Sequence, residues 1–154
     1  MRIADFGLRI EKIINPQSAI RNSQSKRGVE KMDFDKKMNP EIMKDRTKQF
    51  AIQIIGLCRR FPNNRDGRLI GDQLFRSGTS VASNYRAACR ARSRAEFISK
   101  LGIVEEEADE VIFWLEIINE IKLLDQQLTA PLIKEGNEIL AIVVSSINTA
   151  RKNK

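Results

Sequence analysis

Residues 93–115 read SRAEFISKLGIVEEEADEVIFWL and carry the clearest helix signals of the chain. It opens with Ser93 and Glu96 in the S-x-x-E form of a capping box, in which the hydroxyl and the carboxylate satisfy backbone N–H groups at a helix start. An apolar stripe follows at three- and four-residue spacing, as expected for a helix with one buried face. The stripe consists of Phe97, Leu101, Val104, Ala108, Val111, Ile112 and Leu115. A long amphipathic helix is therefore predicted from Ser93 to about Leu123.

The same periodicity predicts two helices before this one. The first begins at Asn39-Pro40, an N-cap followed by proline at the first helical position, and reaches about Arg60. Its periodic positions are Met43, Thr47, Phe50, Ile54, Leu57 and Phe61. After a break at residues 61–64, we expect Asp66 to cap a second helix that reaches about Arg92.

A fourth helix is expected to open at Pro131, after a connection at residues 124–129. Its apolar stripe consists of Leu132, Ile139, Leu140, Val143 and Ile147. Nothing in the chain alternates as a strand does. Four amphipathic helices with short connections bury their stripes most economically as an all-α, antiparallel up-and-down four-helix bundle, here over residues 39–151.

Residues 1–38 differ from the rest of the chain. The run Asn15-Pro-Gln-Ser-Ala-Ile-Arg21 is echoed by Asn22-Ser-Gln-Ser25, and no apolar period is sustained. This low-complexity composition predicts a disordered leader. Two alternatives remain open: a basic arm that touches nucleic acid, or upstream sequence translated from an incorrectly assigned start, since Met32 and Met38 lie just ahead of the helical pattern.

Composition indicates a soluble globular domain in the cytoplasm. The chain has 154 residues, of which 42% are hydrophobic and 31% charged. Cys58 and Cys89 lie in apolar helical contexts without CxxC spacing, so we expect reduced thiols that serve packing. No apolar run approaches the length needed to span a bilayer, and the N-terminus lacks the apolar core of a signal peptide.

Charge is divided sharply along the chain. Residues 59–100 hold ten Lys/Arg against three Asp/Glu, whereas residues 101–127 hold one against eight, giving +7 followed by −7. The split places a cationic surface on one element and an anionic surface on its neighbour. Such a pattern predicts self-association, a polyanionic partner, or both.

The predicted second helix concentrates arginines on one face. At about 100° per residue, Arg68, Arg76, Arg86 and Arg90 fall within an arc of roughly 80°, and Arg92 and Arg94 extend the patch. A planar guanidinium suits bidentate contacts with phosphate or carboxylate. The six arginines are therefore candidates for nucleic-acid binding. The alternative is a solvated face that pairs with acidic neighbours.

The predicted third helix carries a second apolar stripe, roughly opposite its core stripe. It consists of Ile103, Phe113, Ile117 and Ile121. One bundle buries only one of the two faces well, so we predict a homo-oligomer interface at these residues. The alternative is one broad stripe wrapped by the first and fourth helices.

Catalysis finds little support in the chain, which contains no histidine and no glycine-rich nucleotide-binding motif. The acidic Glu106, Glu107 and Glu110 spread around the helix, so a solvated face or ion pairs with arginines is favoured over metal ligation. We expect a protein that is not an enzyme, with no catalytic residues, metal or cofactor.

The sequence resembles the 23S ribosomal RNA intervening-sequence protein family, also called four-helix bundle proteins. The resemblance rests on Arg76-Ser-Gly-Thr-Ser-Val-Ala-Ser-Asn-Tyr-Arg86, on Ser93-Arg-Ala-Glu-Phe97, and on Glu105-Glu-Glu-Ala-Asp-Glu110 with Trp114-Leu115. It spans roughly residues 45–146. Many members have a glutamate where this chain has Ala87, so no role that rests on that carboxylate carries over.

The resemblance implies an up-down bundle that assembles into a ring, typically a pentamer, encoded by a gene often found in inserts of ribosomal RNA genes. It does not imply a ribosomal component. A similar fold occurs in the accessory protein of diversity-generating retroelements, which implies a possible protein partner such as a reverse transcriptase. Two functional hypotheses follow: an oligomer that binds RNA or DNA through the arginine face, or a structural scaffold whose basic and acidic faces pair between subunits or bind a protein. The sequence specifies neither the nucleic-acid target nor the cellular process.

Overall fold

The computed structural model describes residues 39–152, so the predicted leader lies outside the described residues. This part of the chain is built from the helices α2 (Pro40–Cys58), α3 (Arg65–Ala88), α4 (Arg94–Glu120) and α5 (Gln126–Lys152). It contains no strand. The all-α fold class predicted from the periodicity is confirmed.

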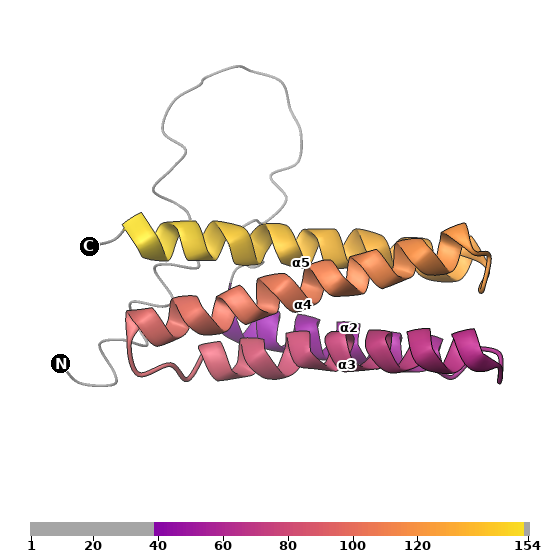
Figure 1. Cartoon of the computed structure of the whole chain (residues 1–154). Helices are drawn as coiled ribbons and strands as arrows, with labels where there is room; N and C mark the ends of the chain where they lie inside the picture. The colour runs from indigo at the N-terminus through magenta and orange to yellow at the C-terminus, as the bar shows by residue number, and fades with distance from the viewer. Residues whose placement is uncertain (1–38, 153–154) are drawn as a thin grey trace, which may run out of the picture.

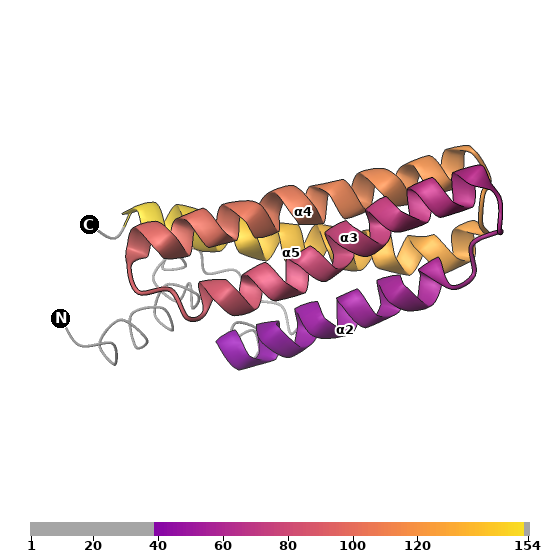
Figure 2. The same cartoon turned by 60° about the horizontal axis from the view of Figure 1, so that its bottom comes forward.

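Successive helices run antiparallel and pack as an up-and-down bundle (Figures 1 and 2). The connections are short, so each helix returns beside the one before it. α3 packs against both α2 and α4, and α4 packs against α5, whereas α2 meets α5 over a smaller area. The interface between α2 and α3 is therefore the main attachment of α2 to the bundle.

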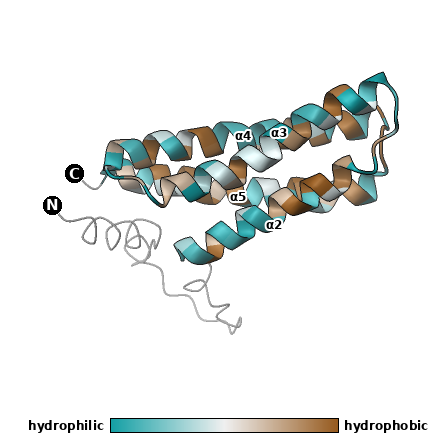
Figure 3. Ribbon diagram, turned by 90° about the horizontal axis from the view of Figure 1, so that it is seen from below, coloured by the Kyte–Doolittle hydropathy of each residue, from teal (hydrophilic) through white to brown (hydrophobic). Residues whose placement is uncertain are grey.

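The apolar stripes meet in one core. Hydrophobic and hydrophilic residues alternate along each helix at helical spacing (Figure 3), because only one face of each helix turns inward. Every residue of the predicted stripe that starts at Phe97 is buried. The largest fully buried side chains come from all four helices and include Phe50, Leu74, Phe97, Leu115 and Ile139. Over the described residues, no helix is long and apolar enough to cross a membrane.

Asparagine caps begin the first two helices. The side chain of Asn39 accepts the N–H of Glu41 at 2.9 Å, which confirms the predicted cap of α2. The predicted cap of the next helix was wrong: Asn64, not Asp66, accepts the N–H of Gly67 at 2.8 Å. Asp66 lies instead in the first turn, where a carboxylate is favourable beside the positive end of the helix dipole. At its other end α3 stops at Ala88, four residues before the predicted end.

The capping box of α4 is present, but one of its two hydrogen bonds involves a different backbone N–H from the standard motif. Ser93 Oγ accepts the N–H of Glu96 at 3.1 Å, as predicted. The carboxylate of Glu96 accepts the N–H of Arg92 at 2.8 Å, one residue earlier than in the standard box. The side chains of Ser93 and Glu96 thus hold the turn between α3 and α4 from both sides.

The end of α4 and the start of α5 both differ from the predicted boundaries. α4 ends at Glu120, and Lys122 has φ 54°, a left-handed conformation that reverses the chain. α5 begins at Gln126 because the side chain of Asp125 accepts the N–H of Gln127 at 2.9 Å. Pro131, the predicted first residue, therefore lies inside the helix. Proline cannot bond the carbonyl of Gln127, but Gln127 is exposed and water can bond that oxygen instead.

Two glycines of α3 allow close approach. A Cβ at Gly78 would lie 2.7 Å from Cγ2 of the fully buried Ile54 of α2. A Cβ at Gly67 would lie 2.1 Å from the carbonyl oxygen of Pro62. The first contact sets how near α2 and α3 can lie, and the second sets how tightly their connection can turn.

A partly buried ion-pair cluster joins α2 to α5. Arg46 Nε donates to Glu135 at 2.5 Å, and Arg46 Nη2 donates to Glu135 at 2.8 Å and to Glu138 at 2.5 Å. The hydrogen bond with Glu135 is the main cause that raises the pKa of Arg46, against the opposing effect of its burial. This fork of hydrogen bonds fixes the smaller α2–α5 contact.

Substituting Gly78→Ala should destabilise the protein, because the stiff, β-branched Ile54 must move to admit the new methyl group. We expect a net loss of about 1–2 kcal/mol after the gain in helix propensity is subtracted. The measurement is the free energy of unfolding in denaturant, followed by circular dichroism.

Gly56→Ala is the matched control, since a Cβ at this exposed position of α2 meets nothing within 4 Å. It should stabilise the protein by roughly 0.5–1 kcal/mol. A Gly78→Ala variant as stable as Gly56→Ala would show that the α2–α3 approach is not close.

Candidate functional site

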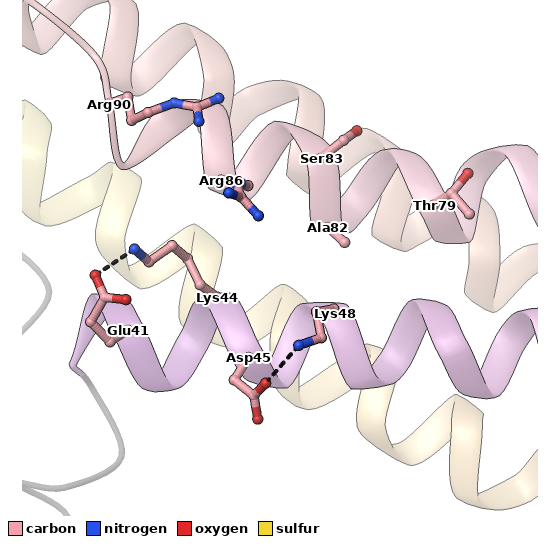
Figure 4. Close-up of a pocket in the computed structure, with 9 residues that line it drawn as sticks. All are labelled: Glu41, Lys44, Asp45, Lys48, Thr79, Ala82, Ser83, Arg86 and Arg90. Atoms are coloured by element: carbon pink, nitrogen blue, oxygen red, sulfur yellow. Dashed lines mark hydrogen bonds and ion pairs between the residues drawn. The ribbon is translucent and has the colours of Figure 1, made fainter.

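A groove of about 610 Å³ runs between α2 and α3 (Figure 4). The residues that line it are Glu41, Lys44, Asp45, Lys48, Thr79, Ala82, Ser83, Arg86 and Arg90. Four of these side chains are cationic and two are carboxylates. We call this feature the cationic groove. Its walls come from the first half of α2 and the second half of α3, which the antiparallel packing brings together.

The α2 wall is partly neutralised within the helix itself. Lys44 forms an ion pair with Glu41, and Lys48 lies 3.4 Å from Asp45, each pair at i, i+3 spacing. In Figure 4 the carboxylate of Asp45 lies on the side of α2 turned away from α3. Exposed pairs of this kind contribute little stability and exchange readily for another anion.

The α3 wall carries the uncompensated charge. Arg86 and Arg90 are exposed and one helical turn apart, and Figure 4 shows the Arg86 guanidinium reaching toward α2. Neither arginine forms an ion pair or a side-chain hydrogen bond with any residue between 39 and 152. Two guanidinium groups with free N–H donors therefore face a groove that already holds two lysines.

The remaining polar groups of the groove act as acceptors. Thr79 Oγ1 donates to the carbonyl of Phe75 at 2.8 Å, and Ser83 Oγ donates to the carbonyl of Ser80 at 3.1 Å. Since each hydroxyl has used its single hydrogen, its oxygen can only accept from a ligand. The groove thus combines charged donors for an anion with uncharged acceptors for a hydroxyl group.

Arg76 lies on the part of the α3 surface nearer α4, which engages it. Its Nη1 donates to Glu107 at 3.2 Å, and its Nη2 donates to both oxygens of Glu110 at 2.6 Å. Partial burial acts to raise the pKa of Glu110, but hydrogen bonds from Arg76 and the Trp114 indole outweigh it and hold that pKa below its usual value. Arg76 is therefore paired inside one chain.

The other three predicted arginines lie apart from the cationic groove. Arg68 donates to Asn63 Oδ1 at 3.1 Å near the α2–α3 connection. Arg92 is exposed in the turn before α4, and Arg94 donates to the carbonyl of Arg151 at 3.2 Å. The predicted arc thus separates into an engaged Arg76, a distant Arg68, and the Arg86/Arg90 pair that lines the cationic groove.

Of the four residues predicted to form the oligomer interface, three lie close together on α4 and Ile103 lies apart from them. Phe113 and Ile121 are each 50% exposed, and Ile117 is half-buried. Ile103 is also half-buried but lies ten residues before Phe113, about 15 Å along α4, beyond the acidic residues that hold Arg76.

Leu69 of α3, 56% exposed, joins this surface. It lies seven residues before Arg76, and Ile117 lies seven residues after Glu110, the partner of Arg76. Seven residues are about two helical turns, and α3 and α4 run antiparallel. Leu69 and Ile117 therefore lie at the same height along the bundle, two turns from the Arg76–Glu110 pair. We call Leu69, Phe113, Ile117 and Ile121 the apolar patch.

The two cysteines are free and half-buried. Burial raises the pKa of Cys58 to about 11 and also raises the pKa of Cys89. Both are therefore neutral thiols near pH 7 and lack the thiolate that nucleophilic chemistry requires. Within residues 39–152, no three His, Cys, Asp or Glu side chains are placed to hold a metal ion.

Sequence reasoning missed Lys44 and Lys48 as site residues. Their i, i+4 spacing on a predicted helix was a weak signal that they share a face. Nothing local showed that this face lies opposite Arg86, because that depends on the register of α2 against α3.

A family model described as 23S rRNA-intervening sequence protein matches residues 41–145. The crystal structure of a protein with unknown function from the S23 ribosomal protein family of Bacteroides thetaiotaomicron is similar to the chain, with 32% sequence identity and a TM-score of 0.66. The match covers 71% of this chain and 97% of that one. No curated protein matches the chain.

Proposed function

The chain belongs to the 23S rRNA-intervening sequence protein family, and on this premise we propose that it is a non-enzymatic oligomer that binds RNA or DNA through the cationic groove. The observation that carries the proposal is the Arg86/Arg90 pair, which lines the groove together with two lysines and has no ion-pair partner between residues 39 and 152.

The four cations of the groove outnumber its two carboxylates, so the cationic groove favours an anion that approaches from solvent. The cations follow a line along α3 rather than converging on one point, since Arg86 and Arg90 are about 6 Å apart along the helix axis. A phosphodiester chain presents its charges in a row and matches such a line. Guanidinium groups bind each phosphate with two parallel hydrogen bonds.

The scaffold alternative uses the same arginines to pair with acidic residues of a second subunit. In the structure Glu107 and Glu110 of α4 already share the guanidinium of Arg76 of the same chain. These two carboxylates therefore have a cationic partner without a second subunit. The arrangement leaves Arg86 and Arg90 for an external polyanion, which favours nucleic-acid binding over charge pairing between copies.

Self-association is supported by the apolar patch. Its four side chains lie on the α3–α4 surface, whereas the cationic groove lies between α2 and α3. Subunits joined through the patch keep their grooves free, so the assembly repeats the groove and gains avidity for a long strand. The family resemblance suggests a pentamer.

Charge reversal at both groove arginines, Arg86→Glu with Arg90→Glu, should weaken binding to a single-stranded RNA by at least about tenfold, because the charged hydrogen bonds to phosphate are removed. The slope of log affinity against log salt should become shallower by roughly 1.4, about 0.7 for each phosphate of a single strand that the variant no longer neutralises. Fluorescence anisotropy at several salt concentrations measures both effects.

The double variant Lys122→Glu with Lys134→Glu is the charge-matched control, since both lysines are exposed and lie outside the groove. It should bind nearly as the wild type does. Equal losses of affinity in the two double variants would mean that net charge, rather than the groove, drives binding.

The double substitution Phe113→Asp with Ile121→Asp should convert the oligomer to monomers, because it places two charges in the apolar patch. Native mass spectrometry reads the subunit number, and circular dichroism should show unchanged helix content since both side chains are half exposed. Ile52→Asp, equally exposed on α2, should leave the mass of the assembly unchanged. A wild type that is already monomeric would contradict the oligomer proposal.

A further inference from the structure

A second hollow, of about 280 Å³, lies on the same α2–α3 side of the molecule, toward the connection between these helices. Its lining residues are Cys58, Phe61, Pro62, Asn63, Gly67, Arg68, Gly71, Asp72 and Phe75. Phe75 stands one helical turn before Thr79, which lines the cationic groove. The two hollows are therefore neighbours along one helix face.

Phe75 is 45% exposed, although a phenylalanine in a bundle helix usually reaches the core. Thr79 and Arg86 follow it at four and eleven residues, a spacing that keeps all three on one face. The rise of the helix places Phe75 about 16 Å from Arg86. An open aromatic ring thus stands in line with the phosphate-binding guanidinium groups.

Polar groups surround this ring. Arg68 Nη1 donates to Asn63 Oδ1 at 3.1 Å, which orients the Asn63 amide so that its own N–H groups stay available. The carboxylate of Asp72, which is exposed, supplies acceptors. An aromatic face bordered by an amide, a guanidinium and a carboxylate matches a flat heterocycle with hydrogen-bonding edges.

We infer that the second hollow binds an unpaired nucleobase, stacked on Phe75, of a single-stranded RNA whose phosphates lie in the cationic groove. The inference rests on the proposed function and narrows its ligand. Bases in a duplex are stacked on one another and cannot present a face to Phe75, whereas single strands stack their bases on exposed aromatic side chains.

The ribose distinguishes RNA from DNA in this setting. Thr79 and Ser83 present oxygens that only accept hydrogen bonds, and the 2′-hydroxyl of RNA is the donor that deoxyribose lacks. Glu41 adds an acceptor at the other wall. These contacts favour RNA in a groove whose four cations would hold either backbone.

The other strongly exposed phenylalanine of the described helices provides a contrast. Phe113 makes an edge-on contact with Trp114, with ring centroids 5.0 Å apart, in the acidic segment of α4. The exposed Asp109 lies four residues before it, on the adjoining part of the helix surface. A nucleic-acid backbone is repelled there, so exposure of an aromatic ring alone does not make a base site.

The test compares Phe75→Leu with the matched control Phe113→Leu, since leucine keeps apolar bulk but removes the ring. Three probes of equal length are titrated by fluorescence anisotropy: a single-stranded oligoribonucleotide, the same strand made abasic, and its DNA counterpart. Native mass spectrometry confirms that both variants keep the assembly of the wild type.

We expect Phe75→Leu to weaken binding of the intact RNA by about tenfold and to leave binding of the abasic strand unchanged. Phe113→Leu should leave the affinity for the intact RNA and for the abasic strand unchanged. The wild type should bind the RNA more tightly than the DNA.

Two results would overturn the base site: Phe75→Leu weakens binding of both the intact and the abasic strand, or it weakens binding of neither strand. Equal affinity of the wild type for RNA and DNA would overturn the choice of RNA. A wild type that binds none of the strands would instead refute the proposed function itself.

Discussion

The contact between Ile54 and Gly78 determines how α2 and α3 lie against each other. Because Ile54 is fully buried and a Cβ at position 78 would lie 2.7 Å from it, the two helices approach as closely as a residue without a side chain permits. α2 has only a small contact with α5, so its position depends on this approach and on the Arg46 cluster. The walls of the cationic groove are the continuation of the same two helices, and their separation follows from the packing below them.

The division of charge along the sequence becomes a division between faces in the fold. Arg76 turns toward the acidic α4 and is neutralised there, whereas Arg86 turns toward α2 and faces its lysines. One helix thus supplies a structural ion pair on one flank and an open cationic surface on the other. The apolar patch lies near the first of these flanks, so the proposed assembly and the proposed ligand binding involve different surfaces of the bundle.

Local chemistry made much of the fold predictable. Asn39 and Ser93 indicated helix starts because their side chains bond groups only two or three residues away. Pro131 indicated the wrong start because the cap at Asp125 begins α5 earlier, and an exposed carbonyl tolerates the missing bond. The groove was only half predictable: helical periodicity identified Arg86 and Arg90, but their position opposite α2 depends on the register between two helices, which no local pattern encodes.

Photo-crosslinking tests most directly whether the α2–α3 surface is the nucleic-acid interface. A single-stranded RNA with thiouridine at scattered positions is crosslinked to the wild-type protein, and the modified peptides are identified by mass spectrometry. We predict crosslinks in the segments that hold Lys44 to Lys48 and Phe75 to Arg90. Crosslinks that map to α4 and α5 and avoid both segments would contradict this assignment.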